Sequence, residues 1–307
     1  MEPERLTRLA DRGLLQSRGR KIGLARALSK MGFCSRAAAV ELIRGGRVRI
    51  NGGVRKDPET PVRLGKDRME VDGKVVGQSE KIYLMMNKPR GVVTTASDER
   101  GRATVYDLLG KGLGWVAPVG RLDKASEGLL LITNDSEWAA RVTAPESGVE
   151  KVYHVQIGEN AKRDCLVGVN QNLLVHYQNP HTELRRVPSL RGAKFRTRGH
   201  PDRPRRSQNE ELIKRLTDGV TVEDGGVLRV KSAAILRSGE RNCWVEIVLN
   251  EGKNRHIRRM FEGLGIEVLR LLRVGIGGLE LGELAKSGVR RLGEEERAKV
   301  FGKLGDV

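Results

Sequence analysis

The strongest restriction on the fold comes from a short apolar run that follows a charged turn. Residues 120–135 read GRLDKASEGLLLITND, and residues 129–132 are uninterrupted apolar side chains. A run of this length between polar flanks is typical of a buried strand. Asp123 precedes it and lies between two cations, Arg121 and Lys124. Nearby cations favour the ionised carboxylate, which in a shielded place can act as nucleophile, base or charge stabiliser.

Residue types alone leave a simpler interpretation of Asp123 open. Burial of a carboxylate beside an apolar strand is unfavourable without a cationic partner. An arginine should therefore pair with Asp123. That pair could be purely structural, at the head of a strand, and on residue types alone this interpretation is the favoured one.

The segments around this turn indicate a mixed sheet domain over residues 79–300. Strand-like stretches such as KIYLMMNKPRGVVTT alternate irregularly with short helices, which favours an α+β domain with a mixed, mainly antiparallel sheet. Near the C-terminus, EGKNRHIRRMFEGLG predicts a helix, because Ile257, Met260, Phe261 and Leu264 share one face. A strand rich in Val and Leu follows it.

Residues 21–78 predict a separate small module of two helices and a hairpin. Leu24, Leu28 and Met31 recur at helical spacing, Ser35 is a plausible N-cap for the second helix, and Asn51–Gly52 is a hairpin turn signal. Residues 1–20 are interpreted as a basic flexible arm. Residues 159–209 are interpreted as a basic, mobile insertion, because the later part is crowded with arginine and lacks apolar periodicity.

The formal charge of +18 points to a polyanionic partner, and nucleic acid is the common one. A membrane surface fits less well, because no amphipathic helix carries the charge beside an apolar face. The three cysteines and five histidines form no ligand spacing, so we expect no disulfide framework and no metal. No apolar run is long enough to span a membrane, and the N-terminus lacks the apolar core of a signal peptide. A cytoplasmic location is therefore expected.

Two family resemblances extend this interpretation. Cys34–Ser35–Arg36, the ELIR turn at 41–44 and GRV at 46–48 before Asn51–Gly52 resemble the small RNA-binding domain of the small-subunit ribosomal protein four type. GRLDKASEGLLLITND, MMNKPRGVVTTASDERGRATVYDLL, EKVYHV and EGKNRHIRRMFEGLG resemble, in order, the motifs of rRNA pseudouridine synthases of the RsuA, RluB, RluE and RluF group. Several separated motifs in one order are a specific signal.

The resemblance implies an isomerase that converts a uridine of rRNA to pseudouridine without a cofactor. It implies that Asp123 is the catalytic aspartate, Tyr153 the active-site tyrosine, and Arg258 the basic residue that pairs with the aspartate. It also implies substrate RNA contacts, from Arg121 at the flipped nucleotide and from Lys88 and Arg90 near the RNA backbone. In the N-terminal module the expected RNA contacts are Arg36, Arg44 and Arg47.

The RNA target follows less directly from the sequence. The long DERGRATVYDLL segment resembles the RluB type, so large-subunit rRNA is the first expectation and small-subunit rRNA the second. Lys124–Ala125, His256 and Gly275 depart from the usual family pattern. The alternatives are a non-catalytic RNA-binding ribosome-assembly factor and, more weakly, a DNA-binding protein. The expected partner is rRNA or a pre-ribosomal particle, and the expected oligomeric state is a monomer.

Overall fold

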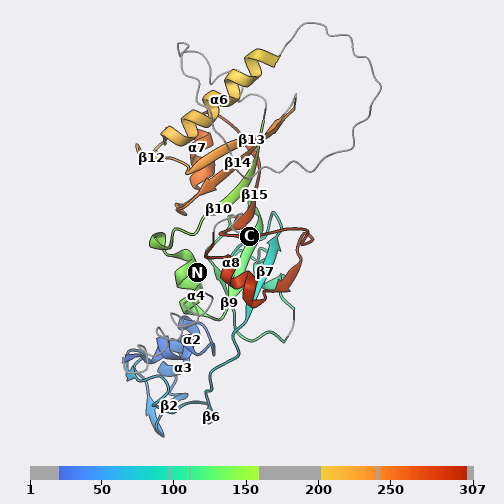
Figure 1. Cartoon of the computed structure of the whole chain (residues 1–307). Helices are drawn as coiled ribbons and strands as arrows, with labels where there is room; N and C mark the ends of the chain where they lie inside the picture. The colour runs from blue at the N-terminus through green and yellow to red at the C-terminus, as the bar shows by residue number, and fades with distance from the viewer. Residues whose placement is uncertain (1–20, 97, 111, 159–201, 240–241, 303–307) are drawn as a thin grey trace, which may run out of the picture.

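The computed structural model describes residues 21–96, 98–110, 112–158, 202–239 and 242–302. The described chain is elongated, with a small N-terminal module at one end and helix α6 (Asp202–Asp218) at the other (Figure 1). The arm predicted at 1–20 and most of the predicted insertion, residues 159–201, lie outside the described residues.

The N-terminal module contains the two helices and the hairpin predicted from the sequence. Its elements are β1 (Ile22–Gly23), α2 (Leu24–Lys30), α3 (Arg36–Arg44), β2 (Val48–Ile50), β3 (Gly53–Arg55), β4 (Pro61–Val62), β5 (Met69–Val71) and β6 (Lys74–Val75). Ser35 caps α3, because its hydroxyl accepts a hydrogen bond from the N–H of Ala38 at 3.1 Å. Asn51 and Gly52 have φ of 50° and 85°, which is the left-handed pair that a tight hairpin turn requires.

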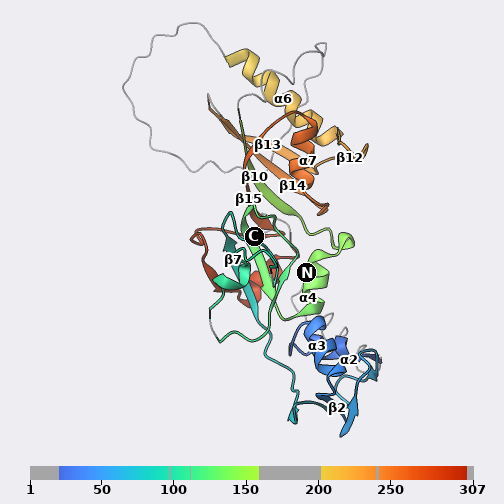
Figure 2. The same ribbon diagram turned by 180° about the vertical axis from the view of Figure 1, so that it is seen from behind.

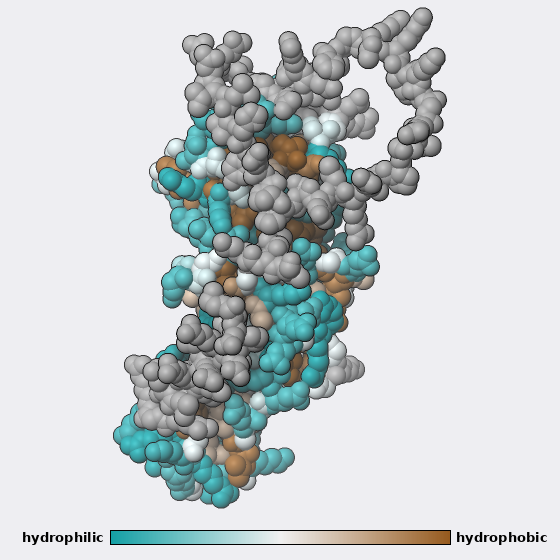
Figure 3. Space-filling view, viewed as in Figure 1, coloured by the Kyte–Doolittle hydropathy of each residue, from teal (hydrophilic) through white to brown (hydrophobic). Residues whose placement is uncertain are grey.

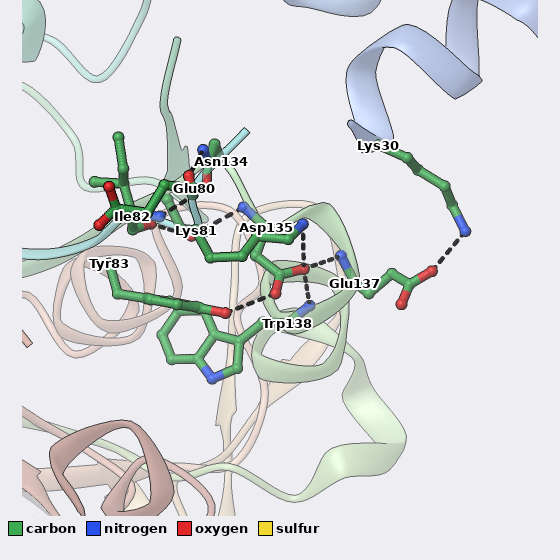
Figure 4. A network of polar contacts seen from close by, with 10 residues as sticks. Lys30, Glu80, Lys81, Ile82, Tyr83, Asn134, Asp135, Glu137 and Trp138 are labelled. Atoms are coloured by element: carbon green, nitrogen blue, oxygen red, sulfur yellow. Dashed lines mark hydrogen bonds and ion pairs between the residues drawn. The ribbon is translucent and has the colours of Figure 1, made fainter. Parts of the chain in front are cut away.

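The module has a core of its own and touches the larger domain through polar contacts. Leu24, Leu28 and Ile43 are fully buried between its helices and strands. At its edge, Lys30 at the end of α2 forms an ion pair of 2.6 Å with Glu137 on α4 (Ser136–Thr143), as Figure 4 shows. The same view shows Asp135, the N-cap of α4, accepting a hydrogen bond from the Tyr83 hydroxyl.

The larger domain is built on a nine-stranded, mainly antiparallel sheet, and the predicted α+β class is confirmed. Its strands are β7 (Tyr83–Lys88), β8 (Ala117–Val119), β9 (Glu127–Thr133), β10 (Lys151–Gly158), β13 (Ser232–Ser238), β14 (Asn242–Leu249), β15 (Val268–Ile276), β16 (Leu279–Glu280) and β17 (Val289–Arg291). The main order is β13-β14-β10-β15-β9-β7-β17, with β8 on β9 and β16 on β15. Within this sheet only β9 and β15 pair in parallel. The sheet is therefore two antiparallel halves joined at one parallel contact.

The helices cover opposite faces of the two halves. In the β13–β15 half, α6 and α7 (His256–Gly263) pack on the face that carries Val155 and Val245. In the β7–β9 half, α4 and the region of α8 (Glu294–Lys299) pack on the face that carries Leu129 and Leu131. Figures 1 and 2 show α6 and α7 together beside β13 and β14, and α4 and α8 beside β9. The helices therefore lie on one face of the sheet before the parallel contact between β9 and β15 and on the other face after it.

The remaining elements of the larger domain are short. They are the 3-10 helices η1 (Val105–Leu108) and η2 (Pro145–Ser147) and the paired strands β11 (Val220–Thr221) and β12 (Val227–Leu228). The face of Leu130 and Ile132 packs against η1 and the residues around it. As predicted, Ile257, Met260, Phe261 and Leu264 are all buried along one face of α7.

The predicted irregular segment ends earlier than expected. Residues 202–209 were predicted to belong to it, but they form the first part of α6. The reason lies further along the helix, where Leu212 and Ile213 pack against the core and Leu216 is fully buried in it. That apolar stripe stabilises a helix whose first turns are polar, and local composition did not reveal it.

The surface of the described residues is mainly polar. Hydrophilic side chains cover much of the N-terminal module and of the β7–β17 half in the view of Figure 3. Among the described helices, none combines the length and the apolar character needed to cross a bilayer.

Candidate active site

Asp123 lies in the loop between β8 and β9, and hydrogen bonds hold this loop at every peptide from 122 to 126. The donors come from two other places in the chain, residues 88–94 and α7. From residues 88–94, Thr94 Oγ1 donates to the carbonyl of Leu122 (2.8 Å), and the N–H of Gly91 donates to the carbonyl of Lys124 (2.8 Å). Lys88 Nζ donates to the carbonyls of Asp123 (3.1 Å) and Ser126 (2.8 Å). From α7, Arg258 Nη2 donates to the carbonyl of Ala125 (3.0 Å). Because five consecutive carbonyls are fixed, the direction in which the Asp123 side chain leaves the loop is fixed as well.

The Asp123 carboxylate is used differently from the structural aspartates of the same domain. Asp135 accepts hydrogen bonds from two N–H groups at the start of α4, and Asp107 accepts one from the N–H of Thr104. In the described part of the chain, the carboxylate oxygens of Asp123 accept no hydrogen bond and form no ion pair. The side chain is partly exposed. The geometry therefore does not match the simple structural Asp–Arg pair that residue types alone favoured.

Lys88 lies below the Asp123 loop and not on the surface. It is fully buried at the end of β7, and its ammonium donates to the carbonyls of Pro89, Asp123 and Ser126. Burial lowers the pKa of Lys88 to about 8, although Asp123 and Glu127 act in the opposite direction. The expected contact of Lys88 with the RNA backbone does not fit this position, because all three donors point at peptide oxygens inside the protein.

Arg258 approaches the loop from α7. Its guanidinium donates to the carbonyl of Ala125 at 3.0 Å and to that of Val268 at 3.4 Å, while Nε is buried without a partner among the described residues. Burial lowers its pKa most, followed by repulsion from Arg255, and attraction to Asp123 raises it. The expected ion pair with Asp123 is not present among the described residues. Arg258 instead lies within electrostatic range of the carboxylate and fixes the peptide two residues after it.

Tyr153 lies on β10, on the face that α7 covers. It packs against the core beneath α6 and α7 and also against the core around Leu130. Its neighbours across the sheet are Ile247 on β14 and Arg273 on β15. Tyr153 is therefore placed where the two halves of the sheet meet, and the residue is partly exposed.

The parallel contact beside the Asp123 loop contains features that the sequence did not identify. Gly128 has a φ of +102°, and a Cβ at this position would lie 2.2 Å from the carbonyl oxygen of Arg273. Arg273 is itself buried and donates from Nε to the carbonyl of Leu129 at 2.7 Å. A charged residue inside the apolar stretch LLRVGI must find a polar partner, and that signal could have located it.

The other predicted RNA contacts lie on exposed surfaces. Arg121 is exposed beside Asp123, and Arg90 is exposed and donates to the carbonyl of Leu269 at 3.4 Å. Arg36 and Arg44 are exposed on α3 of the N-terminal module, apart from the Asp123 loop. Arg47 is also exposed, but its guanidinium is paired with Asp72.

The described residues contain no group of three or more His, Cys, Asp or Glu side chains that could hold a metal ion. The chemistry available at this site is that of a carboxylate on a loop whose backbone is held in place, with the cations Lys88 and Arg258 in electrostatic range.

Comparison with known proteins identifies the family. The sequence model of the RNA pseudouridylate synthase family matches residues 82–263, more than half of the chain, and that of the S4 domain matches residues 22–68. The chain belongs to the RNA pseudouridylate synthase family. It is therefore an isomerase that acts on RNA, and the family predicted from the sequence motifs is confirmed.

The relatives of this pseudouridine synthase match over nearly their whole length. An RNA pseudouridine synthase of Rickettsia prowazekii is 34% identical over 85% of this chain and 90% of the relative. The ribosomal large subunit pseudouridine synthase B of Bacillus subtilis is 29% identical over 89% and 93%. A crystal structure of a pseudouridylate synthase matches the fold with a TM-score of 0.53, at 24% identity, over 91% of this chain and 99% of that one.

Proposed function

We propose that this synthase isomerises a specific uridine of large-subunit rRNA to pseudouridine, with Asp123 as the catalytic carboxylate. The observation that carries the proposal is the Asp123 loop, in which five carbonyls are fixed while the carboxylate has no partner among the residues that the structure describes. The large-subunit target is supported by the name of the Bacillus subtilis relative. Small-subunit rRNA is the alternative target.

The proposed reaction needs no co-reactant. The N1–C1′ bond of the uridine breaks, the uracil turns, and a C5–C1′ bond forms; C5 loses a proton and N1 gains one. Asp123 supplies the carboxylate for bond cleavage at the nucleotide, and Tyr153 supplies a ring against which the uracil can stack. The target nucleotide must leave its base stack to reach Asp123, which is general for enzymes that act on a base.

The cations have different roles in this proposal. Arg258 keeps positive charge near Asp123 and fixes the peptide of Ala125. Arg121 and Arg90 are exposed near the loop and contact the RNA around the flipped nucleotide. Arg36 and Arg44 on the N-terminal module bind the folded RNA at a distance from the reaction, where phosphate contacts set affinity and position.

The test is tritium release from rRNA labelled at uridine C5. Wild type, Asp123→Asn and the control Asp224→Asn are compared; Asp224 is an exposed aspartate paired with Arg259. We expect release by wild type and by the control, and none by Asp123→Asn, which should still bind RNA. Separate large-subunit and small-subunit substrates, as free rRNA and as pre-ribosomal particles, identify the target. Turnover by Asp123→Asn would remove Asp123 from its proposed role.

A further inference from the structure

Glu127 is the acidic first residue of β9, a strand in which all residues from Glu127 to Thr133 are buried. Its own side chain is only 8% exposed, and both oxygens bind the guanidinium of Arg270 on β15, at 3.2 Å from Nε and 3.1 Å from Nη2. A two-point contact of this kind fixes the orientation of both groups. A nearly buried carboxylate without such a partner would be strongly unfavourable.

This ion pair lies beside the short parallel contact between the two halves of the sheet. β9 and β15 share only the pairs Leu272–Glu127 and Arg273–Gly128. The strands approach so closely at Gly128 that no side chain fits there. The contact between Glu127 and Arg270 therefore adds a side-chain link where backbone pairing is short.

The guanidinium of Arg270 also contacts an aromatic ring. This guanidinium lies 5.7 Å from the ring centroid of Trp244 on β14, and Arg237 on β13 lies 5.2 Å from the same ring. Arg237, Trp244, Gln156 and Arg270 are neighbours in register across four adjacent strands, β13, β14, β10 and β15 (Figure 1). Glu127 thus connects the start of β9 to a row of side chains across the other half of the sheet.

Glu127 is linked to Asp123 through Lys88. The peptide before Glu127 carries the Ser126 carbonyl, which accepts from Lys88 Nζ at 2.8 Å, and the same ammonium holds the carbonyl of Asp123. Lys88 is fully buried, so its charge needs nearby negative charge. Glu127 and Asp123 are the two carboxylates that raise the pKa of Lys88, whereas burial and Arg273 lower it.

We propose that Glu127 is a positioning residue for the isomerisation. It anchors the end of the Asp123 loop to β15 through Arg270, and its negative charge compensates the buried Lys88 ammonium that holds the carbonyls of Asp123 and Ser126. The proposal rests on the proposed function of Asp123. Glu127 itself does not contact the reacting nucleotide.

The test separates charge from anchoring with two variants. Glu127→Gln removes the charge and keeps the shape, whereas Arg270→Met removes the anchor and leaves the charge of Glu127. Glu246→Gln is the control, because Glu246 lies on the same sheet but pairs with His154 at 3.3 Å. The titration of Lys88 is followed by NMR of its labelled side chain in the free enzyme, and kcat and KM are measured by tritium release.

In Glu127→Gln we expect the Lys88 midpoint to move about one pH unit lower, because a carboxylate that favours the charged amine is lost. We expect kcat at pH 7 to fall about tenfold, which corresponds to about 1.4 kcal/mol, with KM for RNA unchanged. In Arg270→Met, kcat should fall while the Lys88 midpoint stays or rises, since the Glu127 charge is no longer compensated by Arg270.

Two results would overturn the proposal. One is a Lys88 midpoint in Glu127→Gln equal to that of wild type and of Glu246→Gln. The other is the same downward shift in both Glu127→Gln and Arg270→Met, which indicates general loosening of the sheet. If Glu127→Gln does not fold, Glu127→Asp replaces it and should retain the Lys88 midpoint while kcat falls. Absence of turnover by wild type on any rRNA would refute the proposed function, whereas the Lys88 titration would still test the link to Glu127.

Discussion

Replacement of Lys88 by methionine should lower the activity of the enzyme much more than its stability. The substitution leaves three carbonyls, two buried and one partly buried, without this donor, at a cost of up to about 1–3 kcal/mol each. It also removes a buried charge whose pKa lies at about 8 instead of 10.5, a difference of about 2.5 units that corresponds to about 3 kcal/mol. The two effects oppose each other, so the net loss of stability should be only a few kcal/mol.

Activity should respond far more strongly. Without Lys88 the carbonyls of Asp123 and Ser126 lose their common donor, so the carboxylate is no longer held in one direction. A displacement of about 1 Å at a reacting group can cost about 100-fold in rate, and we expect a loss of that order in kcat. Lys30→Met is the control, because the Lys30 ammonium pairs with Glu137 on α4 and does not contact the Asp123 loop.

The pH dependence of stability gives this prediction a definite sign. The folded-state pKa of Lys88 lies below its unfolded value, so between about pH 8 and 10.5 the unfolded chain binds more protons than the folded one. The burial cost is therefore complete below pH 8 and disappears above 10.5. Urea unfolding should show wild type gaining about 3 kcal/mol relative to Lys88→Met between pH 7 and 10.5. A constant difference across that range, or a kcat in Lys88→Met within threefold of wild type, would refute the reasoning.

Two further predictions concern the strand contact and the RNA-binding module. Gly128→Ala should destabilise the protein by more than about 3 kcal/mol in urea unfolding, because its Cβ would meet a backbone oxygen of β15. Gly91→Ala, also at positive φ but in open space, should cost only about 1 kcal/mol, and equal losses would contradict the packing argument. Joint replacement of Arg36 and Arg44 by alanine should weaken rRNA binding and flatten its salt dependence, with kcat unchanged at saturating RNA. Arg47→Ala should have a smaller effect, because a neighbouring aspartate already pairs with its guanidinium; an unchanged salt slope in the double variant would contradict this role.

Features that depend on a few neighbouring residues could be predicted from the sequence. The Ser35 cap, the Asn51–Gly52 turn and the apolar face of α7 are all present in the structure. Each of them follows from side-chain chemistry within about one helical turn or one hairpin. The motifs that indicated the family also lie in continuous stretches, and the family that they indicated is confirmed.

The role of Lys88 could not be predicted in the same way. In the sequence it belongs to NKPRG, where it looks no different from the neighbouring Arg90, yet one cation is fully buried and the other is exposed. The difference arises because β7 pairs with β9, which brings Lys88 opposite Gly128 and below the Asp123 loop. Partners 35 and 38 residues away in the chain decide where its ammonium points.

The arrangement of the Asp123 loop explains how an aspartate can be anchored in the protein while its carboxylate is available for reaction. An aspartate fixed through its own oxygens, as Asp135 is at the start of α4, has already committed them to hydrogen bonds. Asp123 is held instead through the carbonyls of its own and adjacent peptides, by donors from β7, the segment after it, and α7. The carboxylate oxygens are thus left for a ligand, while the backbone sets the point and direction at which the side chain leaves the loop. Among the described strands of the sheet, the one parallel pair lies directly after this loop. Asp123 therefore lies where the two halves meet, Arg258 approaches its loop from α7, and Tyr153 packs against the cores of both halves.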